Sequence, residues 1–470
     1  MLEFRPFTPA DAKTVIPYLH CTATGFSDLT AGYFAMWSEE MDIRWCIEND
    51  VLYSSQMIGD QPAFFPPLGK DTSGALDALI GYVQENDLPL RFYAVDEAML
   101  AKLRNDARFA HVPAAYDVRW SDYVYAFDTA ATFRGKKFSG QRNHVNRYTR
   151  EYGEPDARWL TEADMPQIEA MLAEYEEEHS DRNALEQSEL DGTRLLLSHL
   201  DDFGQIAACL WKDERIIAFS IGEIVGDMLF IHAEKALRSY KGAYPVMYTS
   251  FVRLVQDRYG ALQWVNREDD SGDPGLRTSK MQYQPVRRLH KYFTHVNSPA
   301  PVSRHVTIDA GTVLLTPFSE KDRHNYHVLN TDPDVSRWWG YDYENDLNIT
   351  SEINEDLFYD MTMFDMDYGD SVNWAIRETE DGEMIGEVIL WNMTWNGDVE
   401  IGCRLLPGYQ GKGFGKAAFR AAAEYVKNTL HRKPRAKCYR ENTASKAMIT
   451  ASGLTECSSD ETFIYFQASA

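Results

Sequence analysis

The sequence has 470 residues, of which 44% are hydrophobic, 13% aromatic and 25% charged. At roughly 100–200 residues per domain, this predicts two to four globular domains and excludes a mainly disordered chain. The formal net charge of −25 opposes non-specific binding to nucleic acid or to an anionic membrane, because both need a positive surface.

Six cysteines lie far apart, without a CxxC pair. This spacing argues against a zinc cluster and a disulfide scaffold, so we expect no metal and reduced thiols. No signal peptide is visible at the amino terminus. The most apolar long stretch, 216–233, carries Glu223 and Asp227 and does not predict a membrane span. We therefore expect a cytoplasmic protein.

Hydrophobic periodicity and turn residues predict an alternation of strands and helices along the chain. A weak break at 152–156 precedes a predicted helix at 163–178. The middle segment has predicted strands at 206–211, 216–223 and 227–234, followed by a helix at 246–259. Two prolines and small polar residues predict an exposed linker at 296–305. After it, strands are expected at 312–318, 371–377, 384–391, 399–406, 436–439 and 462–466, with a helix at 414–427.

A glycine-rich segment, QGKGFGK at 410–416, lies between a predicted strand and a predicted helix. Glycines at a helix N-terminus let backbone N–H groups surround a phosphate. A Walker A loop would need glycine at 410 and Ser or Thr at 417, where Gln410 and Ala417 stand. A dinucleotide fingerprint needs G-x-G-x-x-G, whereas the spacing here is G-x-G-x-G. A third pattern, Gln/Arg-x-x-Gly-x-Gly/Ala, is matched in full.

Residues 307–466 resemble the GCN5-related N-acetyltransferase (GNAT) family, in its ribosomal-protein-alanine subtype. The resemblance rests on EIGCRLLPGYQGKGFGKAAF at 400–419 and on CYRENTAS at 438–445. It implies that the loop amides bind the pyrophosphate of acetyl-CoA and that strand 401–406 splays from its neighbour to hold the pantetheine. The cofactor-binding residues that it implies are Leu405, Gln410, Gly411, Lys412, Gly413, Phe414, Gly415, Lys416 and Asn442.

Charge along this segment fits an acetyl transfer to an amine. Residues 309–400 hold 4 Lys/Arg against 22 Asp/Glu, whereas 404–446 hold 11 against 2. A basic half suits CoA phosphates and an acidic half suits a cationic acceptor, although the acidic run 342–370 is equally well explained as a solvated face. Glu400 is our candidate base, or else only a salt-bridged carboxylate. Relatives often use a Tyr as the acid; 443–449 has none, so Ser445 is a candidate, or the thiolate leaves unassisted.

Two polar segments mark the first 295 residues. Residues 134–150 carry six Lys/Arg and no acid, which fits either a basic binding surface or a solvated helix. Residues 264–285 predict a strand that ends in a dense polar loop and then a helix, an arrangement common at functional sites but also in ion-paired structural loops.

Together, residues 3–295 resemble a bacterial family related to the C-terminal catalytic domain of phosphatidylglycerol lysyltransferase. The motifs are FFPPLGK at 64–70, GKKFSGQRNHVNRY at 135–148, HAEKALRSYKGAY at 232–244 and NREDDSGDPGLRTSK at 266–280. The resemblance implies two fused GNAT-like modules and a relation to enzymes that move an amino acid from aminoacyl-tRNA to a lipid. The membrane domain of those enzymes is not seen here, and loop 238–244 departs from the CoA-binding pattern. Candidate site residues are Glu234, Arg238, Lys241, Gly242, Asn266, Arg267, Glu268, Asp269 and Lys280.

The expected fold is thus mixed α/β, with tandem acyl-CoA N-acyltransferase modules at 1–150 (without an evident CoA loop), 151–295 and 306–470. The favoured function is acetyl-CoA-dependent transfer of an acetyl group to a small-molecule or peptide primary amine, and the acidic half of the segment favours a cationic acceptor. One alternative is aminoacyl transfer from tRNA by the N-terminal pair, which the net charge of −25 disfavours. Another is that the pair only binds the acceptor. DNA is not an expected partner.

Overall fold

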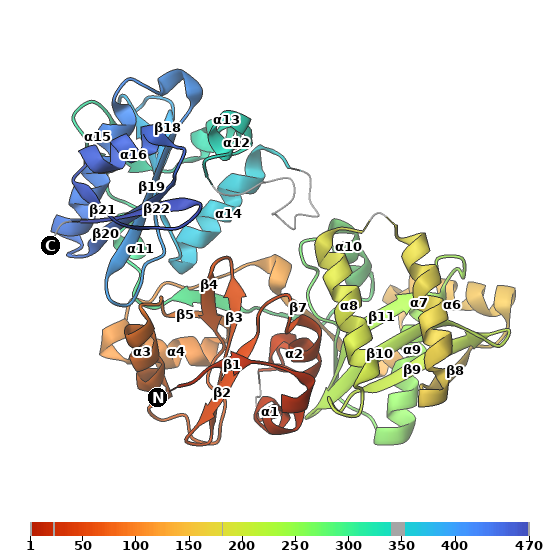
Figure 1. The fold of residues 1–470 in the computed structure, drawn as a ribbon. Coiled ribbons are helices and arrows are strands. Elements are labelled where there is room, and N and C mark those ends of the chain that lie inside the picture. The colour runs from red at the N-terminus through yellow and green to blue at the C-terminus, as the bar shows by residue number, and fades with distance from the viewer. Residues whose placement is uncertain (1, 22–23, 181, 340–352, 469–470) are drawn as a thin grey trace.

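The computed structural model describes residues 2–21, 24–180, 182–339 and 353–468, which form a mixed α/β fold with three sheets. Figure 1 shows the C-terminal region, in blue, above the N-terminal region that holds β1 to β5, with the region of β8 to β11 beside the latter. Each sheet packs helices against buried, apolar strand faces.

The first sheet has the order β1-β2-β3-β4-β5-β14-β6. Its neighbours pair antiparallel except for β4 and β5, which are parallel. The strands are β1 (Arg5–Pro6), β2 (Arg44–Glu48), β3 (Val51–Ile58), β4 (Gln61–Phe64), β5 (Arg91–Val95), β6 (Ala115–Tyr116) and β14 (Tyr292–His295). The helices are α1 (Ala12–Leu19), α2 (Ala31–Trp37), α3 (Ala75–Asn86) and α4 (Glu97–Asn105).

The second sheet has the order β13-β7-β12-β11-β10-β9-β8, with β11 and β12 as its parallel pair. The strands are β7 (Asp122–Ala126), β8 (Asp156–Trp159), β9 (Ile206–Lys212), β10 (Arg215–Val225), β11 (Met228–Ala236), β12 (Trp264–Asn266) and β13 (Arg287–Leu289). The helices are α5 (Phe127–Thr132), α6 (Ser139–Tyr152), α7 (Met165–Glu178), α8 (Ala184–Ser198), α9 (Ala243–Tyr259) and α10 (Pro274–Gln282).

The third sheet has the order β15-β16-β17-β18-β19-β20-β22-β21, with β19 and β20 parallel. The strands are β15 (Ile308–Asp309), β16 (Leu314–Pro317), β17 (Val372–Arg377), β18 (Gly386–Trp391), β19 (Asp398–Leu405), β20 (Lys433–Tyr439), β21 (Leu454–Ser459) and β22 (Phe463–Ala468). The helices are α11 (Ala300–Ser303), α12 (Arg323–Thr331), α13 (Pro333–Ser336), α14 (Glu355–Tyr368), α15 (Phe414–Glu424), which continues as a π-helical turn over Tyr425–Thr429, and α16 (Thr443–Ala451).

The first two sheets exchange strands. β7 follows β6 in sequence but pairs with β12 in the second sheet, and β14 follows β13 but pairs with β5 in the first. The change of sheet therefore falls between Tyr116 and Asp122, not at the expected division at residue 150. Local sequence does not carry this information, because strand pairing is decided by burial against distant segments.

The expected linker at 296–305 is only partly exposed, at positions such as Val302, which is 69% exposed. Val296, Ala300 and Ser303 are buried, and 300–303 form α11. The prolines that suggested a loop instead begin this short helix, where a missing N–H costs nothing. Of the acidic run 342–370, residues 342–352 lie outside the described residues, and α14 covers most of the remainder.

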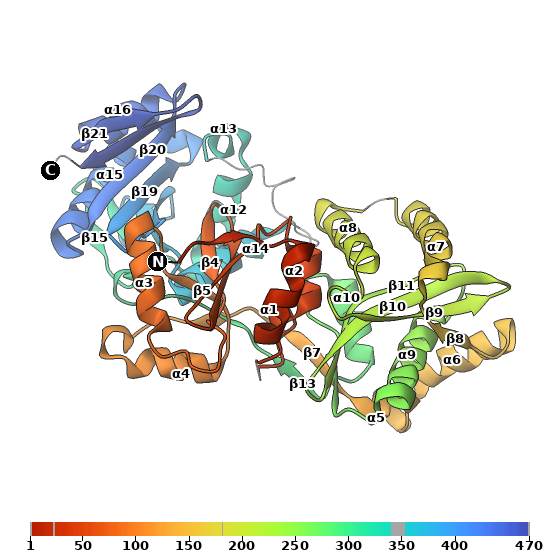
Figure 2. The ribbon, with the colours of Figure 1, turned by 60° about the horizontal axis from the view of Figure 1, so that its bottom comes forward.

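The third-sheet region is fastened to the first. Buried Arg91 pairs with Asp370 at 3.0 Å between Nη1 and Oδ2, and the ring of Phe293 on β14 lies against Phe364 and Tyr368 of α14. Figure 2 shows α14 beside β4 and β5, and α2 on the side of the first region that faces α8. Within the described ranges, no helix combines the length and apolarity that crossing a membrane requires.

Candidate active sites

A wedge opens between the two parallel strands of the third sheet. β19 and β20 pair only from Asp398↔Lys433 to Glu400↔Arg435, although β19 continues to Leu405 and β20 to Tyr439. Backbone polar groups need partners, so strands that part in this way can receive an extended ligand along their inner edges. The splay expected for 401–406 is therefore present, and Glu400 lies at its vertex.

The glycine loop follows β19 directly and ends at the N-terminus of α15. Gln410 donates through Nε2 to the carbonyl of Leu405 at 3.0 Å, which anchors the loop to the strand. Gly411 and Gly413 have φ of +74° and +87°, and a Cβ at either would meet no atom within 4 Å. Gly413 is the N-cap of α15. Open backbone amides at a helix N-terminus fit a phosphate group.

The other loop residues are divided between packing and solvent. A Cβ on Gly415 would lie 3.3 Å from Met448 Sδ and 3.4 Å from Leu405 Cδ1, so this glycine lets α15 approach β19. Leu405 is buried, whereas Lys412 and Lys416 are exposed beside the amides and add positive charge. Phe414 is half-buried against the core.

Glu400 faces the side of the sheet opposite to α15. Its Oε2 accepts from Asn392 Nδ2 at 3.0 Å and its Oε1 lies 3.7 Å from Lys437 Nζ. Burial raises the pKa of Glu400 against the opposing influence of Lys437 and Asn392. The carboxyl group therefore titrates closer to neutrality than an exposed glutamate, as a general base requires.

Asn442 and Ser445 lie at the end of β20. Asn442 Oδ1 accepts from the backbone N–H of Ser445 at 3.0 Å and caps α16. Ser445 is half-buried beside Cys438, whose side chain belongs to the core between the sheet and α15. Glu400 and Ser445 thus approach the wedge from opposite faces of the sheet.

Two tryptophans that sequence reasoning missed lie at the same wedge. A Cβ on Gly402 would lie 2.7 Å from Trp339 Cη2, and the guanidinium of Arg404 lies 4.3 Å over the Trp339 ring. Trp338 lies 5.9 Å from the ring of Tyr439 on β20. The adjacent tryptophans are the sequence signal that could have drawn attention, but their distance from 400–445 in the chain hides the contact.

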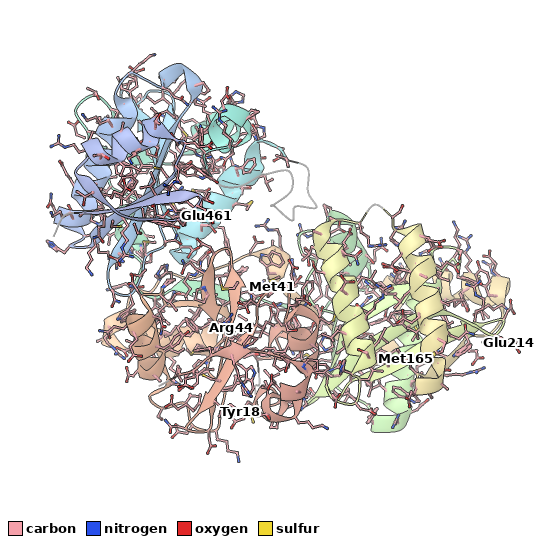
Figure 3. The ribbon with its side chains drawn as sticks, in the orientation of Figure 1. Tyr18, Met41, Arg44, Met165, Glu214 and Glu461 are labelled. Atoms are coloured by element: carbon pink, nitrogen blue, oxygen red, sulfur yellow. The ribbon has the colours of Figure 1, made fainter. Side chains whose placement is uncertain are left out.

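A cavity of about 1110 Å³ lies between the first and second sheet regions. Met41, labelled in Figure 3, is among its lining residues and lies where the first region faces α8. Of the predicted residues, those that line the cavity are Glu234, Arg238, Lys241, Gly242, Arg267, Glu268, Asp269 and Lys280.

Lys291, which sequence reasoning missed, organises one wall of this cavity. Its ammonium is fully buried and pairs with Asp28, with Asp122 at 2.7 Å and with Asp269 at 3.2 Å. Tyr93 also donates to Asp28. Burial alone would lower the pKa of Lys291, but the three carboxylates raise it well above its ordinary value. Of these groups, the carboxylates of Asp28 and Asp269 line the cavity itself.

Two further carboxylates of the cavity wall are held by cations. Glu234 accepts from Arg267 Nη2 at 3.0 Å, and Arg267 lies over the rings of Tyr248 and Tyr283. Glu268 accepts from His232 Nδ1 at 2.7 Å. Burial alone would lower the pKa of His232, but Glu223 and Glu268 raise it to about 9, so its imidazolium persists at neutral pH. Gly32 leaves the room for this ring, since a Cβ there would lie 2.2 Å from His232 Cδ2.

Lys280 and Asn266 serve mainly the loop itself. Lys280 Nζ donates to the carbonyls of Arg267, at 2.6 Å, and of Asp269, and burial lowers its pKa. Asn266 does not line the cavity: its Nδ2 donates to Gly25 O and to Asp122 Oδ2 at 2.9 and 2.8 Å. The polar loop at 264–285 therefore combines structural bonds with a cavity wall.

The loop that precedes α9 has its amides already occupied. Glu178 accepts from the backbone N–H of Arg238 at 2.7 Å and of Ser239 at 3.3 Å. Gly242 has φ of +92°, but a Cβ there would lie 2.6 Å from the carbonyl oxygen of His144 on α6. Residues 139–150 of the basic segment thus lie in α6, which covers this loop.

Known protein families match the N-terminal and C-terminal parts of the chain separately. Residues 22–295 match the family described as phosphatidylglycerol lysyltransferase, C-terminal. The chain belongs to this family. Residues 312–455 match the acetyltransferase (GNAT) domain family, and the protein is a transferase whose C-terminal sheet has the GNAT fold. The fusion expected from the sequence is confirmed.

Several individual proteins resemble parts of the chain. An uncharacterised protein of Mycoplasmoides gallisepticum is 25% identical over 264 residues, which cover 55% of this chain and 79% of the relative. A conserved protein of unknown function from Bacteroides thetaiotaomicron is 27% identical, with a TM-score of 0.58, and covers 62% of this chain and 99% of its own. A GNAT-family acetyltransferase from Bacillus anthracis is 19% identical over 34% of this chain and 97% of its own, with a TM-score of 0.28.

Proposed function

We propose that the protein transfers the acetyl group of acetyl-CoA to a primary amine in the wedge between β19 and β20. The observation that carries this proposal is the position of Glu400 at the vertex of the wedge, with the open amides of 411–415 at its far end. These amides, with Lys412 and Lys416, would hold the pyrophosphate, and the inner edge of 401–405 would hold the pantetheine. Acetyl-CoA would supply the thioester carbonyl.

The side chains of the chain itself would move the protons. Glu400 accepts a proton from the ammonium of the acceptor, directly or through water, so that the nitrogen lone pair attacks the carbonyl carbon. The N–C bond forms and the C–S bond breaks, and the second proton of the attacking nitrogen passes through Ser445 Oγ to the leaving sulfur, so that the products are the amide and the free thiol of CoA, and Glu400 returns its proton to water. Raised pKa, half-burial and access from the face opposite to α15 support Glu400 as the base.

We propose that each of the three sheets is one acyltransferase-like module. Counted from β1, β8 and β16, with β15 as an additional edge strand of the third sheet, each places a single parallel pair between the fourth and fifth strands of an otherwise antiparallel order, followed by a seventh and a sixth position. The first two modules would then exchange their seventh strands. β14, which comes late in the chain, completes the first sheet, and β7, which comes earlier, completes the second. The module bounds follow this pairing rather than residue 150, and the third module begins near 306.

A second candidate function concerns the N-terminal pair, which we propose as an aminoacyltransferase that draws on aminoacyl-tRNA. Its support is the cavity, which is lined by the carboxylates of Asp28, Asp269 and Glu268 and by the cationic side chains of Arg182, Arg238 and Lys241. Such a division suits a substrate with an ammonium at one end and phosphate at the other. A purely acceptor-binding role for the pair fits the same cavity.

Calorimetric titration of acetyl-CoA into the full chain tests the first function, followed by mass spectrometry of the products from a panel of primary amines. One binding site and an acetylated amine are the expected results, and an absence of binding would refute the proposal. For the second candidate, a gel shift with aminoacyl-tRNA should weaken steeply as salt rises. A shift that is absent at low salt would count against it.

A further inference from the structure

The acceptor side of the wedge includes a residue from the first sheet region. Asp60 lies at the turn between β3 and β4, and its Oδ2 is 4.0 Å from Lys437 Nζ. The same ammonium lies 3.7 Å from Glu400 Oε1. A carboxylate from the N-terminal region therefore shares a cation with the proposed base.

The ammonium group of Lys437 already occupies the space between Asp60 and Glu400. The ammonium of Lys437 lies 5.3 Å from the centroid of Trp391 and 5.6 Å from that of Phe463, within the distance at which aromatic faces attract cations. Two carboxylates and two rings therefore surround one ammonium, so that with both carboxylates ionised the cluster of Asp60, Glu400 and Lys437 carries a net negative charge. Asp60 is 58% exposed in its side chain, so that a ligand can reach it.

The turn that carries Asp60 is fixed to the C-terminal region. Buried Arg91 donates through Nη2 to the carbonyls of Ile58 and Gln61 at 3.0 and 2.7 Å, on both sides of Asp60. Its Nη1 donates to Asp370 beside α14 at 3.0 Å. The guanidinium of Arg91 thus holds the turn in place beside the third-sheet region. Because the turn is already ordered, Asp60 loses little conformational freedom when it binds a ligand.

The loop between β18 and β19, whose Asn392 hydrogen-bonds to Glu400, also contacts the first region. After Asn392, the partner of Glu400, Thr394 Oγ1 donates to Asp87 Oδ1 at 2.8 Å and the N–H of Trp395 donates to Leu88 O at 2.9 Å. The acceptor face of the third sheet is therefore built partly on the first region and not on its own strands alone.

We propose that Asp60 is a specificity-determining residue of the acetyltransferase, which selects acceptors that carry a second positive charge near the reacting amine. The inference rests on the proposed acetyl transfer at Glu400. The second ammonium of the acceptor binds Asp60 and takes the place that Lys437 now occupies, while the first loses its proton to Glu400. The N-terminal region thereby contributes to the substrate choice of the C-terminal site.

The experiment compares 1,4-diaminobutane with butylamine, which differs by lacking the second ammonium, as acceptors for the full chain with acetyl-CoA. We expect Asp60→Asn to lower the ratio of kcat/KM for the diamine to that for the monoamine about fivefold, as for an exposed ion pair. Lys437→Met removes the internal competitor and should raise the same ratio. Asp50→Asn, at the exposed turn before β3, is the matched control, and its ratio should equal that of the parent.

The outcomes separate the two proposals. An unchanged ratio in Asp60→Asn, or an equal fall in Asp50→Asn, overturns the role of Asp60 while acetyl transfer stands. Acetyl-CoA binding without acetylation of either amine overturns the choice of acceptor class. If acetyl-CoA does not bind at all, the proposed function fails, and the role of Asp60 with it. The KM for acetyl-CoA should stay the same in all variants, which shows that the wedge is intact.

Discussion

The loops before α9 and α15 occupy equivalent places in the second and third sheets, yet they treat their backbone amides in opposite ways. Each follows a strand, β11 or β19, that pairs in parallel with the strand after the helix, and each ends in a glycine of positive φ, Gly242 or Gly413. At 238–239 the amides bind the carboxylate of Glu178. At 411–413 the space around both glycines is open.

This difference teaches that a shared topology does not imply a shared ligand. The second region satisfies its polar groups internally, with Glu178 on the loop and Lys291 among three carboxylates, whereas the third leaves the space beside Gly411 and Gly413 open. We therefore expect one acetyl-CoA per chain. Four substitutions test this difference between the second and third regions.

The largest effect on stability is expected at Lys291, which pairs with three carboxylates. Lys291→Met leaves Asp28, Asp122 and Asp269 without their shared cation, and we expect a loss of about 3–5 kcal/mol in the free energy of unfolding. The loss should shrink as pH falls, because the unpaired carboxylates then take up protons more readily in the folded state. Urea denaturation at several pH values measures it, and exposed Lys13→Met should change little. An unchanged midpoint would show that the cluster is not a stabilising unit.

Next comes the proposed base. Glu400→Gln should lower kcat about 100-fold, the scale of a lost general base, and leave acetyl-CoA affinity unchanged. Because burial raises the pKa of Glu400, parent activity should rise with pH along a limb that lies above the ordinary value of 4.5, and the variant should lose this limb. Steady-state kinetics across pH provides the measurement. Exposed Glu383→Gln is the control, and equal kinetics in both variants would exclude Glu400.

Gly413→Asp places a carboxylate and a side chain at the proposed phosphate anchor. We expect acetyl-CoA to bind roughly 100-fold more weakly, from charge repulsion and from the strain of φ at +87°. Gly74→Asp, at the N-cap of α3 in the first region, has nearly the same backbone angles (φ +77° and ψ −4°, against +87° and −5°) and equally open surroundings, so it controls for strain alone. Calorimetry that finds similar affinities for the two variants would contradict the location of the anchor.

The smallest effect concerns Glu178. Glu178→Ala should cost about 1 kcal/mol of stability from lost hydrogen bonds, without creating a second acetyl-CoA site, because the carbonyl of His144 still closes the approach to Gly242. Thermal unfolding and the binding stoichiometry check both parts. A second site in this variant would mean that the Glu178 carboxylate alone separates the two loops in function.

The elements that could be predicted from the sequence alone are those whose conformation depends on residues nearby in the chain. The strand, glycine loop and helix at 398–424 follow from local periodicity and from backbone freedom at Gly411 and Gly413, and the strand, polar loop and helix at 264–282 follow from similar signals. The fusion of two families was equally readable, because motif spacing survives without knowledge of contacts.

Only the tertiary structure decided what lies across the chain from these motifs. Asp28 and Lys291 are far apart in sequence, and neither carries a local pattern that predicts their ion pair. The same holds for Glu178 over the loop at 238–239, for Asp60 beside Lys437, and for the exchange of β7 and β14 between sheets. These contacts are set by which surfaces bury one another on folding, and the free energy of that burial depends on the whole chain rather than on any one segment.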